Sequence, residues 1–446
     1  MLQGMKDRHD LFSRRAFLGA ATVSLAASAV RIPAQSAPSA RQPGQKSVTQ
    51  LRCPPLATVR IGFIGVGGRG SSLLGNLLEI EGVEIKAICD LAPERVQKAQ
   101  QRVAARGKPE PAGYSNGERD FENLCRREDV DVVYIATPWD WHVPMAVCAM
   151  KNGKHAAPEV PAALTLADCW ELVDTAEQTQ RHCMMLENCC YGESEMLVLN
   201  LVRQGVLGEL THGEAGYLHE FAGIPPKVLK SDDWRWRFMA TRNGNLYPTH
   251  GLGPVAQYMG IHQGDRFESL VSMSSLELGL SRRCAALPAD DPRRQSKFAC
   301  GDINTTLIKT ALGRTIMVQY STVQPRPYSR INMICGTKGI FCDYPPRLHL
   351  AGQKDEWETD LQKYHQQYGH SLWKSLREQA KSGGHGGMDY VMNWRFIQCL
   401  REELALDMTV YDAAAWSSLV HLSIESVAHG SQPVAVPDFT RGEWKA

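Results

Sequence analysis

The chain has almost no net charge and lacks an apolar segment long enough to cross a membrane. Forty-nine lysines and arginines face 48 acidic residues, which leaves a formal charge of +1. The apolar stretch at residues 18–30 is shorter than the roughly 20 residues that a spanning helix needs. No long basic run or basic-aromatic stripe breaks the charge balance. These absences argue against a nucleic-acid partner and against stable membrane insertion, and they favour a small neutral ligand.

The thirteen cysteines form neither a disulfide framework nor a metal-binding pattern. Their number is odd, and most lie inside apolar patterns, as Cys89, Cys148 and Cys335 do. Cys189 and Cys190 are adjacent, a spacing that rarely forms a disulfide, and no histidine or cysteine spacing nearby resembles a metal site. We therefore predict buried thiols and no metal.

The N-terminus carries an export pattern. Residues 13–18 read SRRAFL, which matches the twin-arginine signal, and the apolar, alanine-rich residues 18–30 follow directly. The alternative is a chance arginine pair in a disordered tail. We predict that residues 1–50 form a signal peptide and linker, and that the protein is exported, already folded, to the periplasm or the extracellular space.

A glycine-rich motif follows a strongly β-forming run. Residues 58–65 are rich in β-branched and apolar side chains, and they lead into Gly-Val-Gly-Gly-Arg-Gly at residues 65–70, before an amphipathic stretch at 71–80. This strand, turn and helix order is that of a dinucleotide fingerprint. Gly65 allows the tight turn, Gly67 lets the backbone approach a pyrophosphate, and Gly70 lets the helix pack on the strand.

An acidic residue ends the next predicted strand. Residues 83–89 form this strand, and Asp90 follows it, 25 positions after Gly65. A carboxylate there accepts hydrogen bonds from ribose hydroxyls and favours NAD over NADP. Arg69 either touches a phosphate or is a solvated residue at the start of the helix, and Arg95 is expected on a helix surface.

A third strand pattern, at residues 131–138, runs into Trp-Asp-Trp-His at residues 139–142. Ligands of open α/β sheets lie beyond the carboxyl ends of the strands. The two indoles could serve packing alone, but together with the imidazole they favour stacking on the cofactor.

From residue 188 the regular alternation gives way to longer segments. Residues 209–219 read as a strand that carries Tyr217, and helical periodicity covers residues 371–379, 389–406 and 411–426. Aromatic residues gather at 232–237 and 244–254, where they can stack on a sugar ring while Arg235, Thr249 and His250 bind its oxygens. Core packing is the alternative for Trp234 and Trp236.

Residues 383–387 read Gly-Gly-His-Gly-Gly. The four glycines allow the backbone at His385 to take a positive φ and to move. A solvated turn is one interpretation. A histidine that delivers a proton in a ligand site is the other.

Several of these motifs together resemble the glucose-fructose oxidoreductase and inositol dehydrogenase superfamily. They are the fingerprint and the segments at residues 136–138, 153–155 and 159–161. The resemblance implies an α/β fold with a doubly wound, parallel Rossmann sheet over residues 58–187. It also implies an α+β domain over residues 188–446, with an open, mostly antiparallel sheet and C-terminal helices that pack back. Dehydrogenases of the superfamily usually carry a lysine where this chain has Val160, which argues against an ordinary sugar dehydrogenase.

A closer resemblance is to glycoside hydrolase family 109. It rests on NLYPTHGLGP at 245–254, ENCCYG at 187–192, GGHGGMDY at 383–390 and EVP at 159–161, and it extends from about residue 60 to near the C-terminus. The resemblance implies an NAD-dependent α-N-acetylgalactosaminidase. Such enzymes oxidise the sugar at C3, remove the C2 proton as the C1 oxygen leaves, add water and reduce the sugar again, so they need no pair of catalytic carboxylates.

The site residues follow from the motifs and from this resemblance. His385 is the leading acid/base residue, and Tyr217 and His250 are the next candidates for proton removal and positioning, with their roles left undivided. The cofactor site is assigned to Gly65, Gly67, Gly68, Arg69, Gly70, Asp90, Trp139, Asp140, Trp141, His142, Glu159, Val160 and Asn188. The substrate site is assigned to Tyr217, Arg235, Tyr247, Pro248, Thr249, His250 and Tyr328.

Two other functions remain open at this stage. One is a secreted NAD(P)-dependent sugar oxidoreductase that releases reduced cofactor, and the other is a non-catalytic sugar-binding protein. The expected partner is a glycan that ends in α-N-acetylgalactosamine, and the sequence also leaves room for a homo-oligomer.

Overall fold

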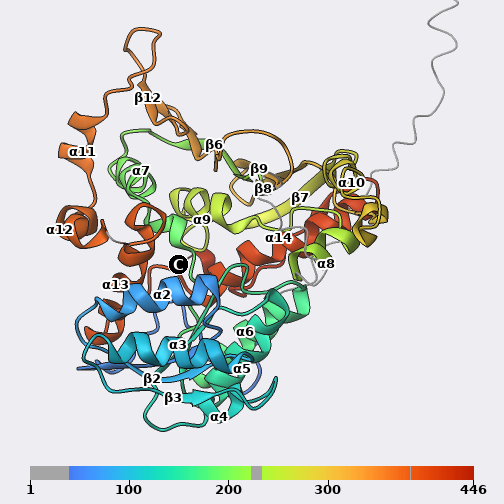
Figure 1. Cartoon of the computed structure of the whole chain (residues 1–446). Helices are drawn as coiled ribbons and strands as arrows, with labels where there is room; N and C mark the ends of the chain where they lie inside the picture. Colours follow the sequence, from blue (N-terminus) through green and yellow to red (C-terminus); the bar gives the residue numbers. More distant parts are fainter. Residues whose placement is uncertain (1–39, 222–233, 382, 446) are drawn as a thin grey trace, which may run out of the picture.

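The computed structural model describes residues 40–221, 234–381 and 383–445 (Figure 1). The predicted twin-arginine motif and the apolar stretch behind it lie outside the described residues. No helix in the described ranges is both long and apolar enough to cross a membrane.

The N-terminal part is built on a five-stranded parallel sheet with strand order β3-β2-β1-β4-β5. The strands are β1 (Val59–Ile64), β2 (Val83–Cys89), β3 (Ala112–Tyr114), β4 (Val132–Ile135) and β5 (His155–Pro158). The helices between and after them are α2 (Gly68–Leu78), α3 (Pro93–Ala104), α4 (Phe121–Cys125), α5 (His142–Lys151) and α6 (Leu166–Thr179). Strands β4 and β5 are buried throughout, as expected for strands covered on both faces. The strand order reverses between β1 and β4, and the predicted doubly wound sheet is confirmed.

The second part contains an eight-stranded sheet with order β12-β11-β10-β6-β9-β8-β7-β13. Its strands are β6 (Leu210–Leu218), β7 (Phe267–Ser274), β8 (Asn304–Thr310), β9 (Thr315–Ser321), β10 (Met333–Gly336), β11 (Gly339–Cys342), β12 (Arg347–Leu350) and β13 (Val434–Ala435). Only β6 and β9 pair in parallel, so the sheet is mostly antiparallel, as predicted. Met273 on β7 and Leu307 on β8 are exposed on one face of this sheet.

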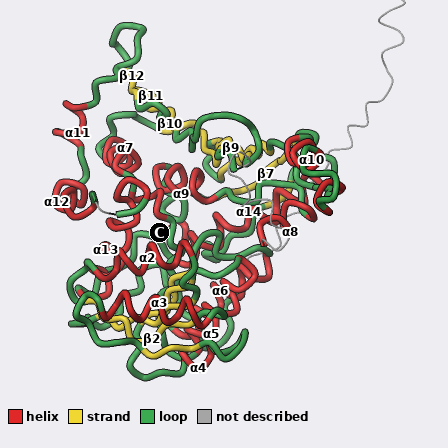
Figure 2. The backbone as a smooth tube through the Cα atoms, in the orientation of Figure 1, coloured by secondary structure: helices red, strands yellow, loops and turns green. Residues whose placement is uncertain are grey.

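The second part contains the helices α7 (Glu193–Arg203), α8 (Trp234–Thr241), α9 (Thr249–Tyr258), α10 (Gly279–Ala285), α11 (Gln362–Tyr368), α12 (Ser371–Ala380), α13 (Met388–Arg401) and α14 (Val410–Ala428). Of these, α9 and α14 pack on the sheet and lie between it and the first part (Figure 2). Helix α9 packs on β6, and α14 packs on both β7 and α6. Helix α13 packs on α2, which places the C-terminal helices against the Rossmann sheet.

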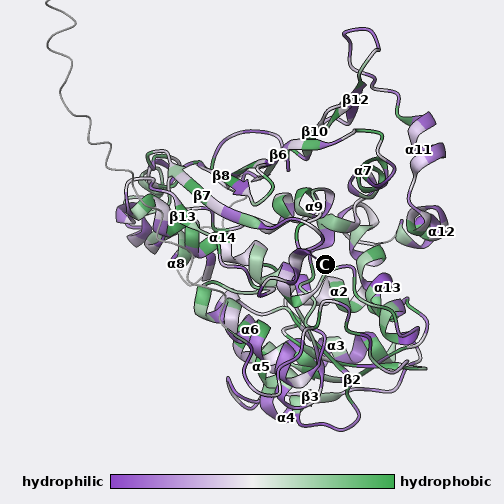
Figure 3. Cartoon of the chain, turned by 180° about the vertical axis from the view of Figure 1, so that it is seen from behind, coloured by the Kyte–Doolittle hydropathy of each residue, from purple (hydrophilic) through white to green (hydrophobic). Residues whose placement is uncertain are grey.

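Hydropathy follows this arrangement. Figure 3 shows α9 between the two sheets coloured mostly hydrophobic, whereas the outlying α11 is mostly hydrophilic.

The predicted helices at 371–379 and 411–426 are confirmed as α12 and α14. The helix predicted over 389–406 ends earlier, at Arg401, because Glu403 adopts a positive φ of 55°.

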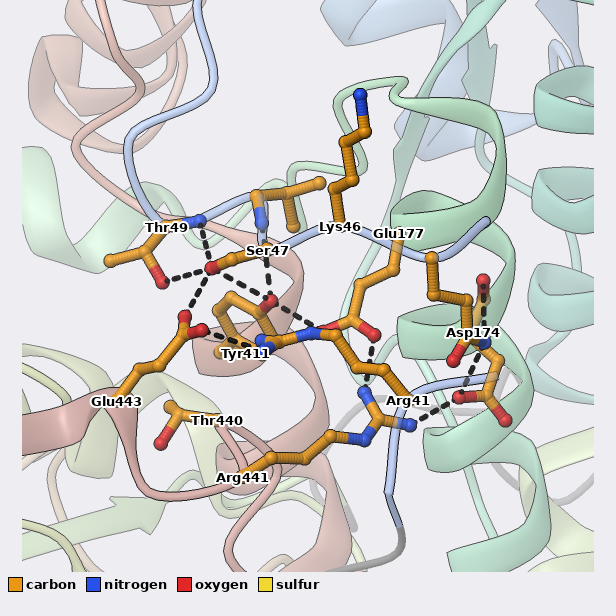
Figure 4. Close-up of polar contacts among 12 residues, drawn as sticks. Arg41, Lys46, Ser47, Thr49, Asp174, Glu177, Tyr411, Thr440, Arg441 and Glu443 are labelled. Carbon is orange, nitrogen blue, oxygen red and sulfur yellow. Dashed lines mark hydrogen bonds and ion pairs between the residues drawn. The ribbon is translucent and has the colours of Figure 1, made fainter. Parts of the chain in front are cut away.

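The segment that begins at residue 40 packs against the body of the protein (Figure 4). Glu177, on α6, has no exposed side-chain surface, and its Oε1 accepts hydrogen bonds from Arg41 Nε (3.1 Å) and the Tyr411 hydroxyl (2.7 Å). Arg441 forms ion pairs with Glu177 and Asp174. The end of the range expected to be a linker is therefore fixed to α6, α14 and the C-terminal segment.

The cysteines are all free thiols. Cys89 is buried as predicted, but Cys148 and Cys335 are only partly buried.

Candidate functional site

A cavity of about 730 Å³ lies between the two parts of the chain. The first part contributes the glycine motif and the ends of β2, β4 and β5, where a parallel sheet binds its ligands. The second part contributes Tyr217, Arg235, Tyr247, His250 and His385. Most of the predicted cofactor and substrate residues therefore line one cavity.

The glycines of the fingerprint divide into two kinds. Gly65 has a φ of +84°, and a Cβ added there would lie 2.7 Å from the Ala136 carbonyl oxygen. A Cβ on Gly70 would lie 1.9 Å from the Gly65 carbonyl oxygen. These two glycines are required by the packing of turn, strand and helix. A Cβ on Gly68 would meet no protein atom within 4 Å, and one on Gly67 would meet only an Arg95 nitrogen at 3.7 Å. The open side of the turn thus leaves room for a pyrophosphate at the N-terminus of α2.

Asp90 is fixed at the end of β2 by the backbone. Its carboxylate accepts hydrogen bonds from the backbone N–H groups of Val66 (2.9 Å) and Ala92 (3.0 Å). The residue lines the cavity, and its side chain is 8% exposed. Arg95, at the start of α3, lies 3.7 Å away and also borders the cavity. A carboxylate held in this way suits the ribose hydroxyls of NAD.

Arg69 is held by two carboxylates. Its Nε donates to Glu159 Oε1 at 2.7 Å, and its Nη1 donates to Asp389 Oδ2 at 2.6 Å. Burial by itself would lower the pKa of Arg69, but the two carboxylates raise it above its usual value. The guanidinium therefore joins α2 to α13 as a permanent charge, although it also lines the cavity.

Asp389 is the centre of this network, and the sequence analysis gave it no role. Its side chain is fully buried. Its Oδ1 accepts a hydrogen bond from Asn188 Nδ2 at 2.6 Å, and its Oδ2 lies 2.8 Å from His385 Nδ1. Burial would raise the pKa of Asp389, but hydrogen bonds from His385 and Arg69 hold it well below its usual value. The spacing of four residues between His385 and Asp389 was the sequence signal for this pair.

His385 precedes α13 in a short turn of 3₁₀ helix. Its φ is +53°, which confirms the left-handed backbone that the flanking glycines allow. A Cβ on Gly384 would lie 2.5 Å from Asp389 Oδ2, so the pair needs glycine there. The His385 side chain is 61% exposed and borders the cavity. Because Nδ1 faces Asp389, Nε2 is the ring nitrogen left for a ligand.

A second imidazole is paired in the same way. His250 Nδ1 lies 2.6 Å from Oε1 of Glu187, whose side chain has no exposed surface. Burial would raise the pKa of Glu187, but His250 lowers it below its usual value. Donor atoms of Glu187, Cys189 and His250 all lie within 4.8 Å of one another, which is metal-ligand spacing. The absence of a metal stays a prediction, and the hydrogen bond to His250 already occupies Oε1 of Glu187.

Aromatic rings form the substrate side of the cavity. Tyr217, on β6, lies 4.7 Å from the Tyr247 ring and 5.5 Å from the His250 ring, measured between ring centroids. Its hydroxyl is 3.1 Å from Nδ1 of His219, a cavity residue that the sequence analysis did not assign. Burial raises the pKa of Tyr217 well above its usual value. Tyr217 therefore stays protonated and is suited to donate a hydrogen bond.

The Trp-Asp-Trp-His segment is only partly directed at the cavity. Trp139 and Trp141 line it, and Trp139 also stacks on Tyr247 with ring centroids 5.6 Å apart. Asp140 instead forms an ion pair with Arg237 and does not line the cavity. His142 borders the cavity, but its two ring nitrogens lie within 2.9 Å of the carbonyl oxygens of Pro161 and Thr137, and burial lowers its pKa. Both residues have a structural contact that the sequence pattern did not indicate.

Three predicted substrate residues also lie outside the cavity wall. Thr249 is fully buried at the start of α9, and Pro248 precedes that helix. Tyr328 is 38% exposed, and its ring lies 6.2 Å from Tyr217 and 4.9 Å from His219. Tyr328 thus contacts two residues of the cavity wall without lining the cavity itself, while Val160 and Asn188 line the cavity as predicted.

Comparison with known proteins identifies the family. Residues 59–187 match a family described as oxidoreductase, NAD-binding Rossmann fold, and residues 191–446 match the C-terminal domain of glycosyl hydrolase 109. The chain belongs to glycosyl hydrolase family 109. A family 109 protein of Shewanella baltica is 49% identical over 444 residues, which cover 97% of each chain. One of Solibacter usitatus is 52% identical over 408 residues, which cover 91% of this chain and 93% of the relative.

Solved structures show the same fold. Levoglucosan dehydrogenase, in complex with NADH and levoglucosan, matches with a TM-score of 0.67 at 20% identity, covering 85% of this chain and 100% of the other. Scyllo-inositol dehydrogenase of Lactobacillus casei matches with a TM-score of 0.60 at 14% identity, covering 86% and 99%. This family 109 member therefore has an NAD-binding oxidoreductase fold, and its cofactor is NAD.

Proposed function

We propose that this protein is an exported glycosidase that hydrolyses terminal α-linked N-acetylgalactosamine with NAD as a recycled cofactor. The observation that carries the proposal is the presence of two carboxylate–imidazole pairs, Asp389–His385 and Glu187–His250, at the same cavity as the dinucleotide fingerprint. A hydrolase of this kind needs both hydride transfer and proton transfer at one sugar. The membership in family 109 and the site geometry support the same chemistry.

The cofactor residues hold the dinucleotide and fix its orientation. The open turn at Gly67 and Gly68 accepts the pyrophosphate, and Asp90 accepts hydrogen bonds from the ribose. When bound, NAD would supply reversible hydride transfer at C3 of the sugar, whose hydroxyl loses its proton on oxidation and regains one on reduction, so that the cycle has no net redox change. Trp139 and Trp141 shield this part of the cavity from water.

The two histidines divide the proton transfers. Asp389 accepts the Nδ1–H of His385, which leaves Nε2 to deliver a proton to the departing C1 oxygen. Glu187 holds His250 Nδ1, which leaves Nε2 to remove the proton from C2. Tyr217 remains protonated and orients the sugar by donating a hydrogen bond. Val160, which has no ionisable group, takes no part in proton transfer.

An aryl α-N-acetylgalactosaminide tests the proposal. Purified protein is mixed with this substrate, and aglycone release is followed together with nicotinamide absorbance. Aglycone release without accumulation of NADH is the expected result. Accumulation of NADH would instead identify a sugar oxidoreductase, and the absence of both signals would identify a sugar-binding protein.

A sugar oxidoreductase is the second candidate, and the similar solved structures favour it, because they include two sugar or inositol dehydrogenases. Val160 argues against it, since the lysine expected in such enzymes is missing.

For location, we propose export by the twin-arginine route, because residues 13–18 carry the SRRAFL motif. Loss of export after replacement of both arginines by lysine would support that route, and unchanged export would contradict it.

A further inference from the structure

The buried carboxylate that holds His250 has one oxygen left over. Oε1 of Glu187 lies 2.6 Å from Nδ1 of His250 and also accepts the backbone N–H of Cys189 at 3.1 Å. Oε2 of the same carboxylate is buried and has no hydrogen-bond partner in full geometry among the described residues. A buried carboxylate oxygen without a donor is costly, so native structures seldom leave one. A donor for Oε2 is therefore to be sought nearby.

The hydroxyl of Thr249 is a second buried atom of this kind. Thr249 has no exposed surface and stands at the start of α9. Within the described parts of the chain, its Oγ1 also lacks a partner in full hydrogen-bond geometry. A hydroxyl can donate one hydrogen bond, which is what Oε2 of Glu187 requires. The sequence analysis assigned Thr249 to the substrate, but the residue does not line the cavity, so its hydroxyl is free for another role.

Helix α9 brings these two atoms together. Thr249 precedes His250, whose ring already holds the Glu187 carboxylate. Thr249 and Gly253 are four positions apart in the helix, so they lie on the same face. A Cβ on Gly253 would lie 3.1 Å from Cγ of Glu187. This face of α9 therefore packs directly against the Glu187 side chain.

Another buried donor near this carboxylate faces the other way. Nε1 of Trp416 has no partner among the residues that the structure describes. The indole approaches Gly253 with Cζ3, which would lie 2.9 Å from the same Cβ. Cζ3 belongs to the benzene edge of the ring, opposite Nε1. Thr249 is thus better placed than Trp416 to donate to Glu187.

We propose that the Thr249 hydroxyl donates a hydrogen bond to Oε2 of Glu187 and so positions the carboxylate that orients His250. The inference rests on the proposed glycosidase function, in which Nε2 of His250 removes the proton from C2 of the sugar. With Oε1 bound to His250 and Oε2 bound to Thr249, the plane of the carboxylate is fixed. The imidazole then keeps the orientation that directs Nε2 into the cavity. Thr249 is therefore a positioning residue and not a substrate ligand.

The charge of Glu187 depends on few neighbours. Burial would raise the pKa of Glu187, but the His250 charge and hydrogen bonds from His250 and Thr249 lower it. The other titratable groups that face the pair from neighbouring elements are Cys189, Cys190, Tyr217, His219, Tyr247 and Tyr328. Burial raises the pKa of these thiols and phenols and lowers that of His219, so all six are neutral near pH 7. Loss of the Thr249 donor should therefore raise the pKa of Glu187.

Two substitutions at Thr249 test the hydrogen bond in the NAD-loaded protein. Thr249→Val keeps the branched shape and removes the donor, whereas Thr249→Ser keeps the hydroxyl. With an aryl α-N-acetylgalactosaminide, we expect Thr249→Val to lower kcat at least about tenfold while KM stays within about twofold, because Thr249 does not touch the substrate. Thr249→Ser should retain most of the wild-type kcat. A raised KM with unchanged kcat in Thr249→Val would make Thr249 a substrate ligand and overturn the inference.

The pH profile of kcat is a second readout. Acidification should abolish activity when the Glu187–His250 pair takes up a proton. A hydrogen bond to a charged group corresponds to about one pH unit, so the acidic limb of Thr249→Val should lie about one pH unit higher than those of the wild type and Thr249→Ser. Thr306→Val is the matched control, because Thr306 is also fully buried, bonds to Ser272 and Asn304, and does not line the cavity. An unshifted limb in Thr249→Val, or the same shift in the control, would overturn the inference.

Unfolding measurements separate this inference from the proposed function. Should no glycoside be cleaved, the glycosidase proposal fails, and urea denaturation then tests the hydrogen bond alone. Without the donor, the charged form of Glu187 is less stable, so Thr249→Val should unfold more easily than Thr249→Ser at pH 7. This difference should shrink by about half towards pH 4, where Glu187 of Thr249→Val takes up a proton. A difference that is equal at both pH values would show a packing effect only and would refute the hydrogen bond.

Discussion

Nδ1 of His385 lies 2.8 Å from Oδ2 of Asp389, and the same oxygen accepts a hydrogen bond from Arg69 at 2.6 Å. One buried carboxylate thus connects the glycine motif of the Rossmann domain to the histidine of the Gly-Gly-His-Gly-Gly loop. The cofactor site and the proton-transfer site share this residue. A change at Asp389 should therefore affect both.

Replacement Asp389→Asn removes the charge that holds His385 and Arg69. We expect turnover to fall by roughly 10²–10⁴-fold, the usual contribution of an oriented acid or base. Cofactor retained through purification should also fall, because Arg69 would lose one of its two anchors. Asp407→Asn is the control, since Asp407 pairs with Arg395 on α13 and does not line the cavity. Wild-type turnover in Asp389→Asn would contradict the role of the pair.

Replacement His385→Ala should act on the leaving-group step. We expect turnover to fall by roughly 10²–10⁴-fold for a poor leaving group and much less for an activated aryl group, whose oxygen needs little protonation. Exchange of the C2 proton with deuterated solvent should persist, because the proposed mechanism assigns that step to His250. Rates near wild type for every substrate would show that His385 is only a loop residue. An equal loss for all leaving groups would move its role to positioning or to C2 chemistry.

Replacement Glu187→Gln should impair proton removal at C2. The amide keeps the shape of the side chain but removes the charged oxygen that faces His250 Nδ1, so we expect slower exchange of the C2 proton and a turnover at least tenfold lower. Treatment of the unaltered protein with a chelator should leave its activity unchanged. Loss of activity with the chelator, restored by a divalent metal, would assign Glu187, Cys189 and His250 to a metal site instead.

Two glycines of the fingerprint should respond differently to alanine. Gly70→Ala places a Cβ 1.9 Å from the Gly65 carbonyl oxygen, so we expect the free energy of unfolding to fall by about 1–3 kcal/mol. Gly68→Ala meets no protein atom within 4 Å, so the free energy of unfolding should stay within about 0.5 kcal/mol. Its retained NAD should nonetheless decrease, because the new methyl faces the pyrophosphate. Urea denaturation and release of NAD on denaturation measure the two effects, and a stable, fully loaded Gly70→Ala variant would disprove the packing argument.

A pair of buried histidines should make the fold sensitive to acid. The rings of His155 and His182 lie 5.0 Å apart, and His155 Nδ1 accepts the backbone N–H of His182. Burial lowers the pKa of His182 to about 4 and that of His155 well below its usual value. The unfolded chain binds protons at these rings below about pH 6.5, whereas the folded chain binds them only at a lower pH. The free energy of unfolding should therefore fall as the pH drops from about 6.5 towards 4.

His182 alone should account for about 2 kcal/mol of this loss at pH 5. Urea denaturation at pH 7 and pH 5 measures it, and His182→Leu should reduce the difference between the two values. His421→Leu serves as control, because the His421 side chain is 42% exposed. Equal pH dependence in the wild type and His182→Leu would refute the assignment.

The sequence determined the features that depend on local geometry. Gly65 and Gly70 could be assigned from their spacing, since a tight turn and a close helix–strand contact each admit little else. Helices α12 and α14 and the strand that carries Tyr217 followed from periodicity, because burial of one face imposes a repeat on the residues. The positive φ of His385 followed from the glycines beside it.

Only the tertiary structure decided which groups became partners. Arg69 and Asp389 are separated by 320 positions and Glu187 and His250 by 63, so no local pattern could pair them. The same holds for Asp140, which pairs with Arg237, and for Thr249, which the start of α9 buries. Hydrogen bonds between distant side chains depend on how sheets and helices pack, and that packing is fixed by the burial of apolar surface over the whole chain rather than by any one motif.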